Sequence, residues 1–222
     1  MNDLDPWRAR LMQLAVADAA DDGAHDLNHL HRVWKNAQAL LKDYPAADAL
    51  IVLAACYLHD LVNLPKNDPQ RHLASRQAAV RACDELGKLG FPADKLAGLA
   101  HAIEAHSFSA GIAPLTIEAR IVQDADRLDA LGAVGLARLY YTAGRMGSAL
   151  AHPSDPLGRA RAMDDRTYAL DHIEVKLATL PATMSTAAGR AMGERRLAWL
   201  RAFRDDFVAE WGDEWRGDTA DD

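Results

Sequence analysis

The sequence predicts an all-α protein built as a single domain. Apolar residues recur three or four positions apart along most of the chain, which is the spacing of one face of a helix. No convincing strand alternation of four or more residues stands outside these patterns. With 222 residues, of which 50% are hydrophobic and 26% charged, the chain has the composition of a soluble globular protein with a sizeable core. These observations together favour a helical bundle.

The first part of the chain predicts three helices. An apolar stripe over residues 7–15 makes the first helix. Asp26 has the side chain of an N-cap for the second, whose apolar stripe covers residues 30–41. The third helix begins near residue 46 and contains ten consecutive apolar residues. It ends in a loop over residues 61–72, which is marked by prolines and asparagines.

The middle of the chain continues the helical pattern. A helix is expected over residues 71–89, and Asp94 is expected to cap the next one, which runs to residue 106. Residues 115–143 then predict either one long helix or two abutting helices, with Gly132 or Gly135 at the break.

The last part of the chain predicts a long loop and two more helices. The loop covers residues 144–158. Residues 165–180 and 188–211 have amphipathic patterns and predict helices. Residues 217–222 are expected to form a frayed tail.

Charge and apolar patterning exclude several classes of partner. The net charge of −7 and the absence of any stretch rich in Lys and Arg count against a nucleic acid polymer. The longest apolar run has ten residues, far too few to cross a membrane. The N-terminal segment carries acidic residues and lacks the basic start of a signal peptide, so we expect a cytoplasmic protein. Cys56 and Cys83 have neither metal nor redox spacing, which fits a reducing compartment.

The ten-residue apolar run ends on His59 and Asp60, two side chains that prefer water or a metal. A His-Asp dipeptide is expected roughly once by chance in a chain of this composition, so the pair alone says little. The other such pair, His25-Asp26, is explained by a capping aspartate. A buried, ionised Asp60 would be costly without a partner. Imidazole and carboxylate together, with no thiolate, suit Mn²⁺, Fe²⁺, Mg²⁺ or Zn²⁺.

Further metal ligands would have to come from other parts of the chain. Residues 25–37 offer His25 and His29, one helical turn apart. Residues 121–133 offer three aspartates with an arginine among them. They are Asp124, Asp126 and Asp129, with Arg127. The residue types alone leave the choice among these donors open.

The order of these motifs resembles the HD-domain metal-dependent phosphohydrolase superfamily. The motifs are H-x-x-R-V at residues 29–33, "LHD" at 58–60 and "DADRLDA" at 124–130. The flanking stretches "LPKNDPQRH", "IEAHSFSA", "HIEVKLATLPATMST" and "ERRLAWLRAF" are similar to one small bacterial branch of it. The resemblance extends from about residue 25 to residue 211, which is most of the chain.

The resemblance implies an all-helical HD-type domain over residues 1–216, with the motif core at about 25–131 and C-terminal helices at 160–216. It also implies one divalent cation, Mn²⁺, Mg²⁺, Fe²⁺ or Ni²⁺. The implied ligands are His29, His59, Asp60 and Asp126. Asp126 is preferred because the superfamily pattern commonly reads "ADR-L", as it does here, and Asp124 is then expected to support or cap.

The function implied is hydrolysis of a phosphoester or phosphoanhydride bond by metal-activated water. The substrate would be a small phosphorylated molecule, with a nucleotide favoured. Asp60 would orient or deprotonate the water. The residues expected to act on or bind the phosphates are Lys66, Arg71, His72, His101, His106 and Arg127.

Three alternatives stay open at this point. A second metal could bind near His101 and His106. The chain could be a catalytically silent HD-type module that senses a ligand, or a helical interaction protein whose His and Asp residues are surface or capping groups. The sequence leaves the exact substrate, the physiological metal and the oligomeric state, including a homo-oligomer, open.

Overall fold

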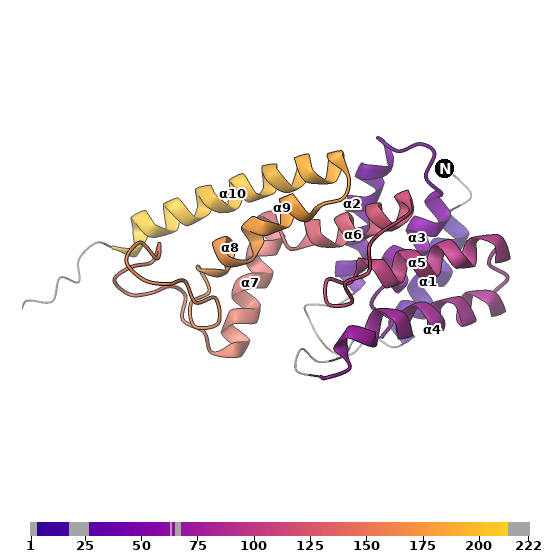
Figure 1. Ribbon diagram of the computed structural model, residues 1–222, viewed down its shortest axis with the longest axis horizontal. Helices are drawn as coiled ribbons and strands as arrows, with labels where there is room; N and C mark the ends of the chain where they lie inside the picture. Colours follow the sequence, from indigo (N-terminus) through magenta and orange to yellow (C-terminus); the bar gives the residue numbers. More distant parts are fainter. Residues whose placement is uncertain (1–3, 18–26, 63, 65–67, 213–222) are drawn as a thin grey trace, which may run out of the picture. The chain divides into compact units, whose positions relative to one another are not determined.

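The protein is helical, as the sequence predicts. Figure 1 shows the computed structural model, which describes residues 4–17, 27–62, 64 and 68–212. Within these residues there are α- and 3-10 helices and no strand, apart from one isolated bridge between Ala149 and Tyr168. None of the helices in these ranges is long and apolar enough to span a membrane.

The contacts divide the chain into two compact units. The first contains Met1–Asp129 and Thr183–Met192, and the second contains Ala130–Ala182 and Gly193–Asp222. The single domain expected from the sequence stays a prediction, and each unit is described by itself below.

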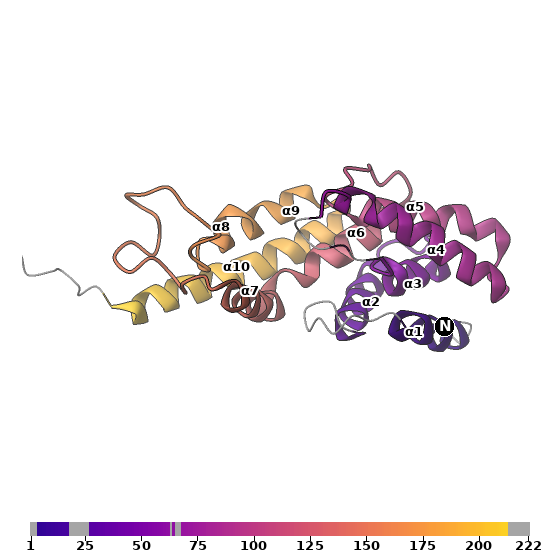
Figure 2. The same cartoon turned by 90° about the horizontal axis from the view of Figure 1, so that it is seen from below.

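The first unit is built around one fully apolar helix. Helix α3 (Ala49–Leu58) begins at Asp48, whose carboxylate accepts hydrogen bonds from the backbone N–H groups of Leu50 and Ile51. Residues 51–58 are all buried, because α3 packs against α1, α2, α5 and α6. Figure 2 shows α3 among these helices. The ten-residue apolar run is therefore the centre of this unit's core.

The surrounding helices follow the predicted order. They are α1 (Asp5–Ala17), α2 (Leu27–Leu41), α4 (Ala74–Lys88), α5 (Leu96–His106) and α6 (Ile117–Asp129), with the 3-10 turns η1 (Arg71–Leu73) and η2 (Ala93–Lys95). Helices α2 and α6 pack together, and Asn36 on α2 fixes their contact by donating to the carbonyl of Ala125 at 3.0 Å.

The second unit contains α7 (Gly132–Met146), the short helices α8 (His172–Val175) and α9 (Leu180–Thr183), the 3-10 turn η3 (Leu177–Thr179) and most of α10 (Ala187–Trp211). The long segment between α7 and α8 is held by Arg161, which donates two hydrogen bonds to the buried carboxylate of Asp171. Glu174 of α8 accepts from Arg201 and Arg204 of α10.

Three details differ from the sequence expectations or decide between them. The segment 115–143 is two helices, α6 and α7, because Gly132 has φ of 75°, a left-handed conformation that interrupts the helix. The Asp94 cap is wrong, because Asp94 lies inside η2 and neither η2 nor α5 has a side-chain capping bond. The Asp26 cap falls outside the described residues.

The predicted helix over residues 165–180 is also wrong. Only the short α8, η3 and α9 form in this region. The Asp164 carboxylate accepts from the backbone N–H groups of Arg166 and Thr167, and the Asp171 carboxylate accepts from that of Asp164. These local hydrogen bonds give the backbone an alternative to helical hydrogen bonds. The apolar periodicity of residues 165–180 is therefore not enough to form a continuous helix.

Candidate metal centre

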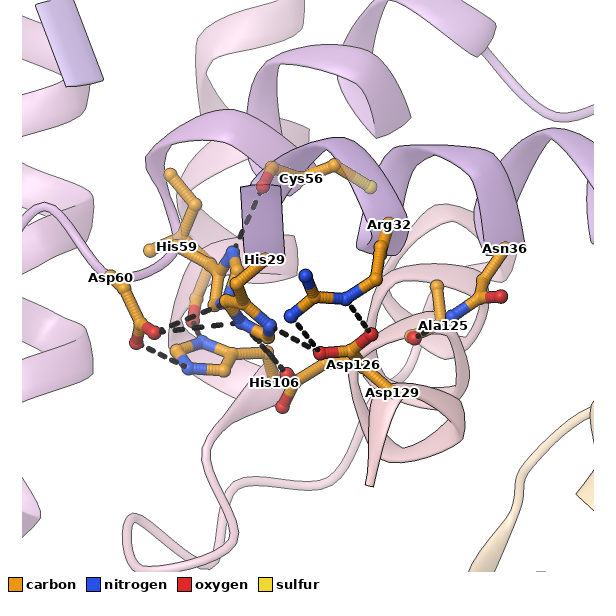
Figure 3. A network of polar contacts seen from close by, with 11 residues as sticks. His29, Arg32, Asn36, Cys56, His59, Asp60, His106, Ala125, Asp126 and Asp129 are labelled. Atoms are coloured by element: carbon orange, nitrogen blue, oxygen red, sulfur yellow. Dashed lines mark hydrogen bonds and ion pairs between the residues drawn. The ribbon is translucent and has the colours of Figure 1, made fainter. Parts of the chain in front are cut away.

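Three separate segments of the first unit bring four predicted donors together. His29 lies on α2, His59 and Asp60 follow the last residue of α3, and Asp126 lies on α6. His29 Nε2 is 3.4 Å from His59 Nε2, 3.9 Å from Asp60 Oδ2 and 3.5 Å from Asp126 Oδ1. His59 Nε2 is 3.4 Å from Asp60 Oδ2 and 3.8 Å from Asp126 Oδ1. Figure 3 shows these side chains pointing toward one another.

A fifth side chain, His106 at the end of α5, completes the cluster. Its Nε2 lies 3.7 Å from Asp60 Oδ1, the carboxylate oxygen that faces away from His29 and His59. The rings of His106 and His59 meet edge to face, with their centroids 4.7 Å apart. The Asp60 carboxylate therefore faces His29 and His59 with Oδ2 and His106 with Oδ1.

The three imidazole rings share one orientation, with Nδ1 turned to a hydrogen-bond acceptor and Nε2 turned to the cluster. In each ring Nδ1 faces an acceptor, and it must carry the proton in order to donate. His59 Nδ1 donates to the carbonyl of Cys56 at 3.0 Å and His106 Nδ1 to that of Ile103 at 2.5 Å. His29 Nδ1 donates to Asp129 Oδ2 at 2.8 Å. Nε2 of each ring is thereby directed to the centre, and in a neutral ring it holds the lone pair that binds a metal.

Burial differs between the two kinds of donor. His29 and His59 are 2% and 1% exposed, whereas the Asp60 and Asp126 side chains are 25% and 29% exposed. The imidazoles thus form the inner wall of the cluster, and the carboxylates lie on the side from which solvent or a substrate can reach it.

Burial and the charges in the cluster together shift three pKa values. Burial lowers the pKa of His59, which favours its neutral, metal-binding form. Burial alone would raise the pKa of Asp60, but His59, His106 and His29 hold it well below its ordinary value. Burial alone would lower the pKa of His106, but the neighbouring Asp60 carboxylate raises it. Asp60 is therefore ionised at neutral pH.

The donor set fits one divalent cation. In an octahedral site with metal–oxygen or metal–nitrogen distances near 2.1 Å, neighbouring donors lie about 3.0 Å apart and opposite donors about 4.2 Å apart. The measured separations of 3.4–3.9 Å fall between these limits. His29, His59 and Asp126 form one possible metal-holding group, and His59, Asp60 and His106 form another. His59 has only Nε2 available, because its Nδ1 donates to Cys56, so the two groups cannot each use it for a separate ion.

The other predicted site residues lie outside this cluster or cannot be placed. Arg71 donates to the carbonyl of Leu64, and the exposed His72 lies 3.1 Å from that of Pro69. His101 Nε2 accepts from the backbone N–H of Leu115 at 2.9 Å.

Arg127 donates to the carbonyl of Thr183, and Lys66 is outside the described residues. His101 belongs to neither of the candidate metal-holding groups found among the described residues, although His106 does. The second metal near His101 and His106 and the phosphate-binding roles stay predictions.

Asp124 lies on a different face of α6 from Asp126. Its buried carboxylate accepts from the backbone N–H groups of Ser185 and Thr186, each at 2.8 Å, and from the Thr186 hydroxyl at 2.6 Å. These residues precede α10, and the Thr186 hydroxyl accepts from the backbone N–H of Gly189 at 2.9 Å, so Thr186 caps α10 and Asp124 holds this capping residue in place. Of the two aspartates, Asp126 is the one near the histidines.

Two residues of the site, Asp129 and Arg32, were given no supporting role from the sequence, where Asp129 appeared only as one of three candidate metal donors. Asp129 accepts from both His29 and Arg32, and it is almost fully buried. The sequence does carry a signal for them, because Arg32 follows His29 by three positions and Asp129 follows Asp126 by three positions. That spacing places each pair on one helix face.

Comparison with known proteins places this site in a family. The family model described as "HD domain" matches residues 26–131, a range that contains all the donors above. An uncharacterized protein of Bacillus subtilis, YpgQ, is 32% identical over 187 residues, which are 82% of each chain. The chain belongs to the HD-domain superfamily. HD domains bind divalent metal ions, in agreement with the His/Asp cluster.

Solved structures extend the similarity to nearly the whole chain. A crystal structure from Lactobacillus plantarum has a TM-score of 0.69 with 31% identity, and covers 93% of this chain and 97% of its own. A crystal structure of an HD-superfamily hydrolase from Bacillus thuringiensis has a TM-score of 0.71 with 27% identity, covering 95% and 97%. Bacillus subtilis YpgQ was crystallised in complex with ADP; that structure has a TM-score of 0.67 with 28% identity and covers 93% of each chain. The protein is thus a member of the HD-superfamily hydrolases.

Proposed function

We propose that this HD domain hydrolyses a phosphoester or phosphoanhydride bond of a small phosphorylated substrate, in a reaction that depends on a divalent cation. The observation that carries the proposal is the convergence of four donor atoms from α2, α6 and the end of α3: His29 Nε2 and His59 Nε2 lie 3.4 Å apart, and each lies 3.4–3.9 Å from an oxygen of Asp60 and from an oxygen of Asp126. Three imidazoles that turn Nε2 toward one point, next to two carboxylates, are arranged for a cation.

The proposed ligands are His29, His59, Asp60 and Asp126. A divalent cation in such a site acts as a Lewis acid on a phosphoryl oxygen and lowers the pKa of water, and so favours hydrolysis at neutral pH. The two buried histidines fix the inner side of the site, while the partly exposed carboxylates leave a face where a phosphate can approach.

Asp60 is the proposed group that orients or deprotonates the attacking water. Its pKa is held well below the ordinary value, so it is ionised and can accept a hydrogen bond from water. His106 lies against the other oxygen of this carboxylate, and its raised pKa favours a form that can donate a proton or bind a phosphate oxygen. The further proposed substrate or catalytic groups are Lys66, Arg71, His72, His101 and Arg127.

The proposed substrate class is a nucleotide. The ADP complex of Bacillus subtilis YpgQ supports this choice, because that protein resembles the present chain over 93% of its length. ADP carries a phosphoanhydride, one of the two bond types that the proposed chemistry cleaves.

The test is a phosphate-release assay over nucleotides with Mn²⁺, Mg²⁺, Fe²⁺ or Ni²⁺ added to metal-stripped protein. We expect activity only with an added cation, and a loss of about 10²-fold or more in Asp60→Asn, the range typical for a catalytic acid or base. Asp94→Asn, an exposed aspartate in η2, is the matched control and should keep full activity. Full activity in folded Asp60→Asn would contradict the mechanism. Binding of a nucleotide without any turnover would favour a silent sensing module instead.

A further inference from the structure

The hydrogen-bond partner of His29 differs in kind from those of the other two histidines in the cluster. His59 and His106 each donate from Nδ1 to a backbone carbonyl three residues earlier in the chain. His29 Nδ1 instead donates to a carboxylate, Asp129 Oδ2, which belongs to another helix and lies 100 positions along the chain. Asp129 is 2% exposed, so this contact is shielded from water.

A second group holds Asp129 in place. Arg32 Nε donates to Asp129 Oδ1 at 2.7 Å, and Arg32 Nη2 donates to Oδ2 at 3.1 Å. This two-pronged geometry fixes the plane of the carboxylate as well as its position. The guanidinium also compensates a negative charge that would be costly to bury alone. Figure 3 shows Arg32, Asp129 and His29 joined in this order.

The helix spacing places the two supporting residues beside the two ligands. His29 and Arg32 are three positions apart on α2, and Asp126 and Asp129 are three positions apart on α6. Each helix therefore supplies one proposed ligand and one supporting residue to the same face. Asp129 links them, because its carboxylate reaches across from α6 to α2.

We propose that Asp129, held by Arg32, is a positioning residue that sets the orientation and metal affinity of His29. The proposal rests on the metal-dependent function above. A carboxylate that accepts from Nδ1 fixes the tautomer with Nε2 free, holds the ring toward the ion and increases the basicity of Nε2. Asp129 itself need not touch the ion or the substrate.

The test measures metal affinity directly, without turnover. Isothermal titration of metal-stripped protein with Mn²⁺ should show binding that is about 10- to 100-fold weaker in Asp129→Ala, the usual effect of losing such a partner. Asp129→Asn keeps one acceptor oxygen and should lose less. Arg32→Met leaves the carboxylate in place but frees its orientation, so it should also weaken binding. The Co²⁺ absorption spectrum of each variant reports whether the geometry around the ion has changed.

Asp171→Ala is the matched control for a purely structural effect. Asp171 is also 2% exposed and is also held by two hydrogen bonds from one arginine, Arg161, but it contacts none of the proposed ligands. Its loss should lower the thermal midpoint and leave the Mn²⁺ affinity unchanged. Asp129→Asn and Arg32→Met provide the readout if Asp129→Ala does not fold.

The outcomes separate this proposal from the one on which it rests. Unchanged Mn²⁺ affinity in the folded Asp129 and Arg32 variants, beside a wild type that binds, overturns the positioning role alone. Equal loss of affinity in Asp171→Ala also overturns it, since the effect would then be a general one of destabilisation. A wild-type protein that binds none of the divalent ions overturns both proposals.

Discussion

Each imidazole in the cluster is oriented by what its Nδ1 contacts. For His59 and His106 the acceptor is the carbonyl three residues earlier in the chain. The last turns of α3 and α5 are therefore enough to direct Nε2 toward the centre of the cluster. His29 depends on a residue from a distant part of the sequence. Proton position at these three rings therefore follows from helix geometry in two cases and from tertiary packing in the third.

Proton competition at His59 predicts how metal binding depends on pH. Burial lowers the pKa of His59 from its ordinary 6.5, so the neutral ring persists as the pH falls to that value, and protonation opposes binding only below it. In the metal-free protein the same shift makes His59 contribute stability above pH 6.5 that is lost as the pH falls toward its folded pKa. We expect Mn²⁺ affinity to change little between pH 7.5 and 6.5 and to fall below pH 6.5. A tenfold loss already between pH 7.5 and 6.5, measured by titration calorimetry, would be inconsistent with a neutral, buried His59.

The residue types of the site were largely predictable, and the supporting contacts were not. His59 and Asp60 stood out because two polar side chains end an apolar helix, and the "ADRL" pattern favoured Asp126 over Asp124. The structure places Asp126 near the histidines, whereas Asp124 accepts a hydrogen bond from the backbone N–H of Thr186, just before α10. Asp129 was named only as a candidate metal donor, because nothing in the sequence shows that its carboxylate accepts from His29 and Arg32.

Helix α6 makes polar contacts on two faces, each through residues three positions apart. Asp126 and Asp129 face α2 and the proposed metal centre. Asp124 and Arg127 face the segment before α10, where they bind the backbone of Thr186 and Thr183. Helix α6 thus carries a proposed ligand and also binds the segment that precedes α10. This segment and the start of α10 belong to the first unit.

The second face of α6 is closely packed and predicts an effect on stability. A Cβ added to Gly189 would lie 2.5 Å from Asp124 Oδ2 and 2.7 Å from Thr186 Oγ1, so the Asp124 carboxylate and the capping Thr186 hydroxyl would have to move. We expect Gly189→Ala to lower the free energy of unfolding by about 1–3 kcal/mol, the usual cost of overpacking. Gly144→Ala in α7 meets no atom within 4 Å and should be neutral or stabilising through helix propensity. Urea denaturation of both variants tests this, and equal stability of the two would refute the close packing at Asp124.

The helices themselves were predictable wherever packing and periodicity agree. The apolar run of α3 and the stripes of α2 and α10 gave elements close to the observed ones. The segment at 165–180 failed because aspartate side chains bind the local backbone, which apolar spacing does not register. The break between α6 and α7 was open in the sequence, and it lies at Gly132, where the backbone takes a positive φ.

At the scale of the molecule, one unit carries the proposed chemistry. All five residues of the cluster, and Arg32 and Asp129 as well, belong to the first unit, and the family model ends two residues after Asp129. The proposed ligands are nearly 100 positions apart in sequence, and buried α3, packed against both α2 and α6, is the scaffold that unites them. A small anionic substrate of an acidic protein needs a local positive charge, which a bound cation would supply.

The stoichiometry of bound metal tests this account most directly. Metal-stripped protein is equilibrated with Mn²⁺, freed of excess ion and assayed by elemental analysis, in the wild type and in His59→Ala. Because Nε2 of His59 belongs to both candidate groups of donors, its removal should disrupt either of them. We expect one ion per chain in the wild type and well under half of that in folded His59→Ala. No bound ion in the wild type, or the same content in both proteins, would contradict the account.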